Sequence, residues 1–133
     1  MVRNNSVKTF SIINDDSSLA VPVLPFEDMK EEVMGKEYIL NLIFTSPKKI
    51  KKLNQIYRDK NTATDILSFP LSSEEGEIYI CLEEAQKKAK KFEREYENFL
   101  AFLFIHGLVH LKGHDHGSTM ENIELKLRRK FNI

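Results

Sequence analysis

The stretch FLFIHGLVHLKGHDHG, residues 102–117, joins an apolar helix to three histidines at offsets of zero, four and ten residues: His106, His110 and His116. On a helix the first two lie about 40° apart around the axis and about 6 Å apart along it, so both imidazoles project from one face. Gly113 follows where a left-handed residue would end the helix and return His116 toward the pair. The spacing therefore predicts a metal site with three protein ligands.

Three protein ligands leave a fourth position for water, which is typical of catalytic rather than structural zinc sites. We therefore expect one zinc ion, although imidazole ligands also suit copper, nickel and iron. The alternative interpretation is an ordinary polar helix face followed by a histidine in a loop. His114 is the remaining histidine, and we expect it to lie beside the ligands or to face the substrate.

The histidine spacing also resembles the H-E-x-x-H-x-x-G-x-x-H signature of the metzincin peptidases. The residue after the first histidine is Gly107, where such a peptidase carries the glutamate that accepts a proton from the zinc-bound water. Peptide hydrolysis lacks its general base here, so a zinc peptidase is a less favoured alternative. Zinc would still lower the pKa of its water to about 7, which leaves other hydrolytic reactions open.

Length and composition predict a single domain over residues 1–133, large enough to bury a core without disulfides. Twenty Lys and Arg residues balance twenty Asp and Glu residues, which argues against a general nucleic-acid-binding coat but allows a local basic patch. Cys81 is the only cysteine, which excludes an internal disulfide and indicates a reducing compartment. Because no apolar run suits a membrane span or a secretory signal, we expect a cytoplasmic protein without membrane contact.

Hydrophobic patterning predicts an α+β fold, with a small, mainly mixed sheet packed against helices. The run FLAFLFI, residues 99–105, places the second half of a long helix in the core, so the metal site stands on a buried helix. Expected strands cover residues 7–13, 38–45, 64–70 and 77–81. Expected helices cover residues 25–34, 47–58 with Ser46 as N-cap, 82–112 with a break near 95–98, and 119–131 with a capping box of Ser118 and Glu121.

A second motif, LNQIYRDKNTATDILSFP at residues 53–70, precedes the histidine motif. Together the two motifs are similar to those of the YbeY family of metal-dependent bacterial endoribonucleases. The segment EGEIYIC, residues 75–81, looks like the LGDIxIC segment of that family, with Glu77 where an aspartate is usual. His114 replaces the tyrosine that is common at its position in the family.

The resemblance implies a compact α+β fold, a zinc ion held by His106, His110 and His116, and cleavage of single-stranded RNA. It also implies a role in ribosomal RNA maturation, notably at the 3′ end of the small-subunit RNA, and in ribosome quality control. The implied partners are ribosomal RNA and the small ribosomal subunit. By the same resemblance, Arg58 matches the functional arginine of the family's cleft.

Elementary chemistry agrees in part with this assignment. Arg58 could hold a phosphate through two hydrogen bonds and stabilise charge on the phosphoryl oxygens, but a guanidinium cannot serve as the base. The alternative is a helix-terminal charge that pairs with the helix dipole or with Asp59. Asp65 and Asp115 could each accept a hydrogen bond from a ligand imidazole, or could instead be a strand-start cap and a turn residue.

The leading hypothesis is therefore a metal-dependent hydrolase, a zinc endoribonuclease in which basic helix faces guide the RNA strand. A non-enzymatic alternative is a ribosome-associated binding module whose zinc only holds the His116 loop in place. The sequence offers clear ligands for only one metal, whereas fast phosphodiester cleavage often uses two metals. This difference favours the non-enzymatic alternative.

Overall fold

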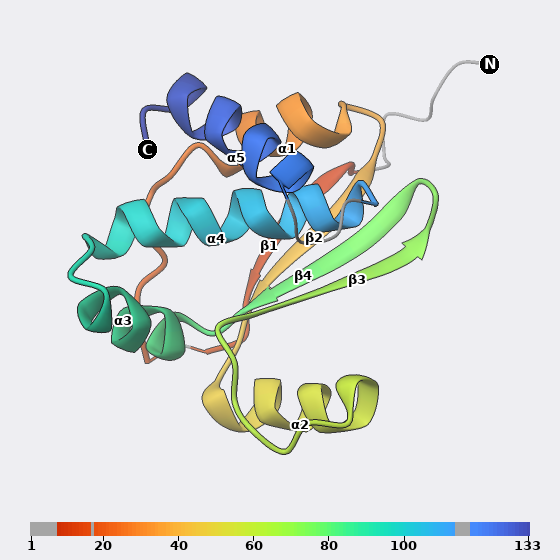
Figure 1. Ribbon diagram of the computed structural model, residues 1–133. Coiled ribbons are helices and arrows are strands. Elements are labelled where there is room, and N and C mark those ends of the chain that lie inside the picture. Colours follow the sequence, from red (N-terminus) through yellow and green to blue (C-terminus); the bar gives the residue numbers. More distant parts are fainter. Residues whose placement is uncertain (1–7, 17, 114–117) are drawn as a thin grey trace.

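The computed structural model describes residues 8–16, 18–113 and 118–133, within which four strands form one sheet in the order β1-β2-β4-β3 and five helices surround it (Figure 1). The strands are β1 (Phe10–Asn14), β2 (Ile39–Phe44), β3 (Ile66–Ser72) and β4 (Glu75–Ile80). The helices are α1 (Phe26–Met34), α2 (Pro47–Arg58), α3 (Leu82–Lys91), α4 (Tyr96–Leu111) and α5 (Ser118–Lys130).

The sheet is mixed, which confirms the predicted α+β class. Strand β2 pairs in parallel with β1 and with β4, whereas β3 runs antiparallel to β4 as the second arm of a hairpin. Alternate residues of β4 are buried: Gly76, Ile78 and Ile80. This period of two shows that one face of the strand meets the main core.

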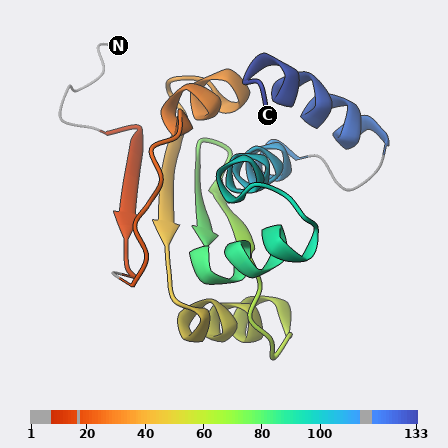
Figure 2. The same cartoon turned by 90° about the vertical axis from the view of Figure 1, so that its left-hand side faces the viewer.

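Helix α4 lies at the centre of that core. It contacts β3, β4, α1, α3 and α5, and Figures 1 and 2 show it lying along the sheet, with α1 and α5 on one side of it and α3 on the other. The run predicted to be buried is buried, except that Phe102 remains partly exposed. Phe104 packs edge-on against Phe26 of α1, with ring centroids 5.2 Å apart. A helix that is apolar on nearly all sides requires such surroundings.

Gly107 sets how closely α4 approaches the sheet. A Cβ atom at this position would lie 2.8 Å from Cδ1 of Ile66 and 3.0 Å from Oγ of Ser68, both on β3, and 3.2 Å from Cδ1 of Ile78 on β4. The hydroxyl of Ser68 also donates to the carbonyl oxygen of Gly107 over 3.4 Å. Only a residue without a side chain allows this contact, because packed interiors leave no space for a methyl group.

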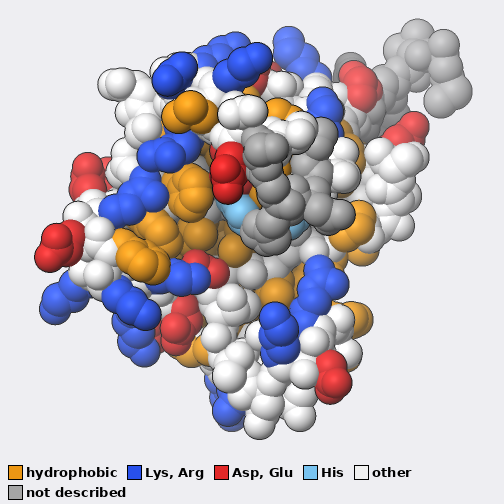
Figure 3. All heavy atoms as spheres, in the orientation of Figure 1, with side chains coloured by type: hydrophobic (Ala, Val, Ile, Leu, Met, Phe, Trp, Pro, Cys, Tyr) orange, Lys and Arg blue, Asp and Glu red, His pale blue; other side chains and the backbone are white. Residues whose placement is uncertain are grey.

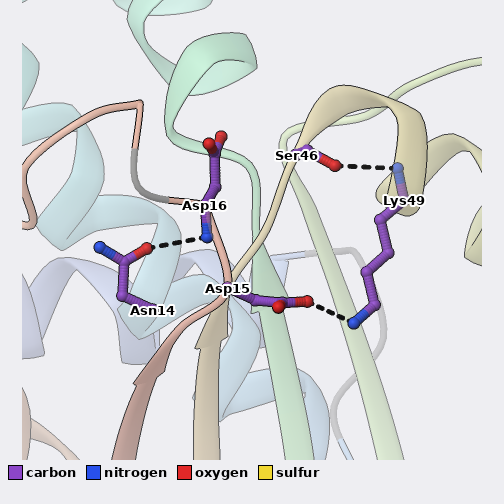
Figure 4. A network of polar contacts seen from close by, with 5 residues as sticks. All are labelled: Asn14, Asp15, Asp16, Ser46 and Lys49. Carbon is purple, nitrogen blue, oxygen red and sulfur yellow. Dashed lines mark hydrogen bonds and ion pairs between the residues drawn. The ribbon is translucent and has the colours of Figure 1, made fainter.

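Helix α2 begins as the sequence predicts, with Ser46 at the N-cap and Pro47 at the first helical position. The Ser46 hydroxyl accepts a hydrogen bond from the backbone N–H of Lys49 over 3.2 Å, and the Lys49 ammonium pairs with Asp15 just after β1 (Figure 4). A small separate cluster, built around Ile50, Leu67 and Cys81, packs this helix against the hairpin. Cys81 is fully buried, as expected for a small hydrophobe, and directly precedes α3.

The break in the long helical region lies at residues 92–95, slightly before the predicted 95–98. Glu93 adopts a left-handed conformation with φ of 55°, and the backbone N–H of Arg94 donates to the carbonyl oxygen of Ala89 over 2.8 Å. These features end α3 before the apolar run begins. Helix α5 confirms the predicted C-terminal helix, but the Ser118 side chain of the expected capping box lies outside the described part of the structure.

None of the helices in the described ranges combines the length and apolarity needed to cross a membrane.

The contact at Gly107 predicts a large cost for any side chain there. We expect Gly107→Val to lower the free energy of unfolding by about 2–3 kcal/mol, because overpacking forces the helix away from β3. Denaturant unfolding followed by circular dichroism measures this change. Lys126→Val, at an exposed position of α5, controls for the helix propensity of valine and should cost only about 0.5 kcal/mol. Equal losses in the two variants would contradict the proposed close contact.

Candidate functional site

His106 and His110 lie one turn apart near the C-terminal end of α4. Their ring centroids are 4.8 Å apart and the rings meet edge to face, so both imidazoles project from the same side of the helix, as the spacing predicts. Gly113 has a φ of 97°, and its N–H donates to the carbonyl oxygen of His110 over 2.9 Å. The helix therefore ends at the left-handed glycine that the sequence indicates.

The two histidines line a pocket of about 590 Å³ between α4, β3, the end of α2 and the loop that follows it. Arg58, the last residue of α2, lines the same pocket. Tertiary structure therefore brings together the two motifs that lie about fifty residues apart in the sequence. The pocket walls also include Asn54, Lys60, Thr62, Ala63, Thr64, Ile66, Leu67, Ser68, Pro70, Gly107 and Leu111.

The guanidinium of Arg58 is held in two ways. Its Nη2 donates to the carbonyl oxygen of Ser68 over 2.9 Å, and its Cζ lies 5.1 Å from the ring centroid of Phe69. Both residues belong to β3, so the strand orients an arginine that is otherwise exposed to solvent. A guanidinium has five N–H donors, which leaves further donors for an anionic ligand.

Asn54 fixes the loop that forms the pocket wall. This residue of α2 is buried, and its side-chain Nδ2 donates to the carbonyl oxygen of Thr62 over 3.0 Å. The backbone carbonyl oxygen of Asn54 accepts a hydrogen bond from the backbone N–H of Lys60 over 3.2 Å. The two bonds attach both parts of the loop to α2 and thereby hold the Lys60 backbone beside the pocket.

The pocket carries positive charge. Arg58 and Lys60 line it, and none of its described lining residues is acidic. An arginine and a lysine without a neighbouring carboxylate attract anions, and a guanidinium matches the geometry of phosphate oxygens. These two cationic side chains are therefore suited to a phosphate-bearing ligand.

Glu124 is a site residue that the sequence reasoning missed. It lies on α5 with 7% of its surface exposed, and its Oε1 is 2.5 Å from Nδ1 of His106. A carboxylate at this distance favours the tautomer with its proton on Nδ1, which places the lone pair of His106 on Nε2. The sequence signal was a glutamate four residues after Met120, on the face of α5 that is buried against the core.

The predicted hydrogen-bonding carboxylates were Asp65 and Asp115. Asp65 is buried, but its Oδ2 lies 3.1 Å from Nζ of Lys88, and it does not line the histidine pocket. His106 therefore has a different carboxylate partner, and a role of Asp65 toward the other imidazoles stays a prediction. Glu77, on β4, does not line the pocket either.

His114, Asp115 and His116 lie outside the described residues, so the predicted third ligand stays a prediction. Within the described residues, no three His, Cys, Asp or Glu side chains are arranged to hold a metal ion. The chemistry of the described pair fits such an ion, since two neighbouring imidazoles project together and one has its tautomer set by a carboxylate.

Comparison with known proteins agrees with the two motifs. The model of the family described as Endoribonuclease YbeY matches residues 4–131. A protein named Endoribonuclease YbeY from Phytoplasma australiense is 37% identical over 108 residues, which cover 71% of this chain and 75% of the relative. A protein of the same name from Aster yellows witches'-broom phytoplasma is 34% identical over 141 residues, with 98% and 91% covered.

A solved structure shares the fold. The solution structure of TM1509 from Thermotoga maritima superposes with a TM-score of 0.64 at 28% identity, and the match covers 92% of this chain and 88% of that protein. The mixed sheet with its central helix is thus found in both proteins. With a family match over nearly its whole length and relatives above 30% identity, the chain belongs to the YbeY endoribonuclease family.

Proposed function

We propose that the protein is a zinc-dependent endoribonuclease that cleaves single-stranded RNA in the cytoplasm. Its family is one of RNA-cleaving hydrolases, and its expected substrate is ribosomal RNA, notably the 3′ end of the small-subunit RNA, with a further part in ribosome quality control. The observation that carries the proposal is the convergence of Arg58 with His106 and His110 on one pocket, whose described lining residues include no acidic side chain.

The metal would be held by His106, His110 and the predicted ligand His116. A bound divalent ion supplies Lewis-acid chemistry at a phosphoryl oxygen and makes water a stronger nucleophile. Glu124 holds the ring of His106 through Nδ1, so the imidazole is oriented before any ion arrives. Zinc is favoured among the divalent transition metals, because it is the metal most often bound by imidazole ligands in sites with an open position.

Arg58 would position the scissile phosphate. Because Ser68 and Phe69 already fix its guanidinium, little side-chain entropy is lost when it binds a phosphate oxygen. As charge builds on the phosphoryl group, hydrogen bonds from a fixed cation strengthen and stabilise the transition state. Among the residues that the structure describes, the hydroxyl-bearing and apolar walls of the pocket carry no group that repels the phosphate.

A zinc peptidase is disfavoured by packing as well as by sequence. The residue after the first histidine would have to carry a glutamate side chain, but the Cβ of any residue at Gly107 would press on Ile66 and Ser68. Gly107 lines the pocket, but the space beside it is taken by the side chains of Ile66 and Ser68. A glutamate at this position, the general base of such peptidases, is therefore incompatible with the close contact between α4 and β3.

Loss of a metal ligand tests the catalytic role. We expect His110→Ala to lose its zinc and to cleave single-stranded RNA at least about 100-fold more slowly, since the metal supplies several kcal/mol of charge stabilisation. Metal content and cleavage are measured on the same preparations, with circular dichroism to verify folding. A folded variant without zinc that still cleaves RNA at the wild-type rate would contradict a catalytic metal site. Intact binding to ribosomal particles, with no cleavage even by the wild type, would favour the binding module.

Arg58 can be tested by charge and by shape. We expect Arg58→Ala to lower kcat/KM for single-stranded RNA about 100-fold, as removal of a transition-state hydrogen-bond donor does. Arg58→Lys should recover only part of this loss, because an ammonium cannot form two parallel hydrogen bonds. Lys52→Ala, at an exposed position of the same helix, controls for net charge. Full activity of Arg58→Ala would instead leave Arg58 as a helix-terminal charge.

The contact between Glu124 and His106 predicts an effect on metal affinity. We expect Glu124→Gln to weaken zinc binding about tenfold, because the amide holds the imidazole less firmly and lowers its basicity. Competition with a chromophoric chelator gives the affinity without any activity measurement. Glu121→Gln, at an exposed position of the same helix, should bind zinc as the wild type does. Unchanged affinity in Glu124→Gln would show that the contact does not support a ligand.

A further inference from the structure

A second groove shares His106 with the pocket described above but lies between α4 and α5. Its volume is about 500 Å³. Because both hollows have His106 as a wall residue, a strand that fills the first and continues into the second passes this histidine. The groove is lined by Phe102, His106, Met120, Glu121, Asn122, Glu124, Leu125 and Arg128.

Two guanidiniums meet one aromatic ring at this groove. The Cζ atoms of Arg94 and Arg128 lie 5.0 Å and 5.2 Å from the ring centroid of Phe102. Asn98 orients the first of them, because its Oδ1 accepts a hydrogen bond from Nη2 of Arg94 over 2.6 Å. The ring of Phe102 is itself 6.0 Å from that of His106. We refer to Arg94, Phe102 and Arg128 as the arginine–phenylalanine cluster.

Glu121 and Glu124 also line the groove, but neither pairs with a guanidinium of the cluster. Among the residues that the structure describes, no carboxylate forms an ion pair with Arg94 or Arg128. The nearest candidate on α5, Glu124, is instead bound to His106. The pKa of Arg94 is lowered from its usual value by burial and by the charge of Arg128. Two cations held on one ring therefore repel one another, and a bound anion would relieve that repulsion.

The surface around the cluster combines charge with apolar area. Figure 3 shows apolar side chains gathered over the N-terminal half of α4, with Lys and Arg side chains along their border and histidine next to them. Phe102 and Arg128 are partly exposed. Aromatic rings and guanidinium groups placed together are what proteins use to bind the bases and phosphates of single-stranded nucleic acid.

We propose that the arginine–phenylalanine cluster is a second RNA subsite, which binds a nucleotide that flanks the cleaved linkage. The phosphate of this nucleotide contacts the two guanidiniums and its base packs against the cluster. The inference rests on the proposed function, because the ligand is the same RNA strand. It assigns two roles to α5. Glu124 holds His106 in place, and Arg128, one turn later, binds the RNA strand.

The test is binding of a fluorescent single-stranded RNA of about 12 nucleotides, within the usual site size of such grooves, to the metal-loaded protein by anisotropy. We expect Arg128→Gln and Phe102→Leu each to weaken binding about tenfold at low salt. Arg128→Gln should also reduce the slope of log affinity against log salt by about 0.7, the value for one phosphate contact on a single strand.

Arg129→Gln is the matched control, because it removes the same charge from the next, exposed residue of α5, and it should change the affinity less than twofold. Metal content, thermal unfolding and gel analysis of the RNA verify that each protein is loaded and folded and that the RNA is intact. Arg128→Lys, which keeps the charge but not the planar group, should bind with intermediate affinity.

The outcomes separate the two proposals. Wild-type affinity in both Arg128→Gln and Phe102→Leu, together with weakened binding in Arg58→Ala, would overturn the subsite and leave the proposed function intact. An equal loss in Arg128→Gln and Arg129→Gln would reduce the cluster to a general charge effect and would also overturn it. Absence of RNA binding by the metal-loaded wild type would overturn both proposals.

Discussion

The structure depends on the burial of one helix. Helix α4 is apolar on nearly all sides, so it is stable only when other elements surround it, and α1, α3, α5 and the β3–β4 hairpin do so. One close contact is at Gly107, where the helix backbone meets side chains of β3 and β4. A helix held on all sides is a rigid support for the histidines that it carries.

Rigidity at the site comes from contacts that cross between elements. His106 belongs to α4, but the carboxylate that sets its tautomer belongs to α5. Arg58 belongs to α2, but the groups that orient its guanidinium belong to β3. His106 and Arg58 are thus each fixed by a neighbour from another element, which prepares the site for its ligand before binding and lowers the entropy lost on binding.

The net charge of the chain does not reveal the local charge of its surface. The sequence is neutral overall, yet the described lining of the histidine pocket carries arginine and lysine without an acidic residue. Several acidic side chains are paired: Asp15, Asp65, Glu83 and Glu84 with lysines, and Glu124 with His106. A protein without net charge can therefore still present a positive groove to an RNA backbone.

The sequence by itself determined what depends on neighbours along the chain. The shared face of His106 and His110, the left-handed end at Gly113 and the N-cap Ser46 follow from helix periodicity and from the conformations that each residue type allows. Only the tertiary structure decided the strand order, the meeting of Arg58 with the histidines and the choice of Glu124 as the partner of His106. Asp65, which belongs to the second motif, pairs instead with Lys88. The reason is that these contacts join residues far apart in the sequence, and their geometry is set by how α4 packs against the sheet and α5, which no local pattern encodes.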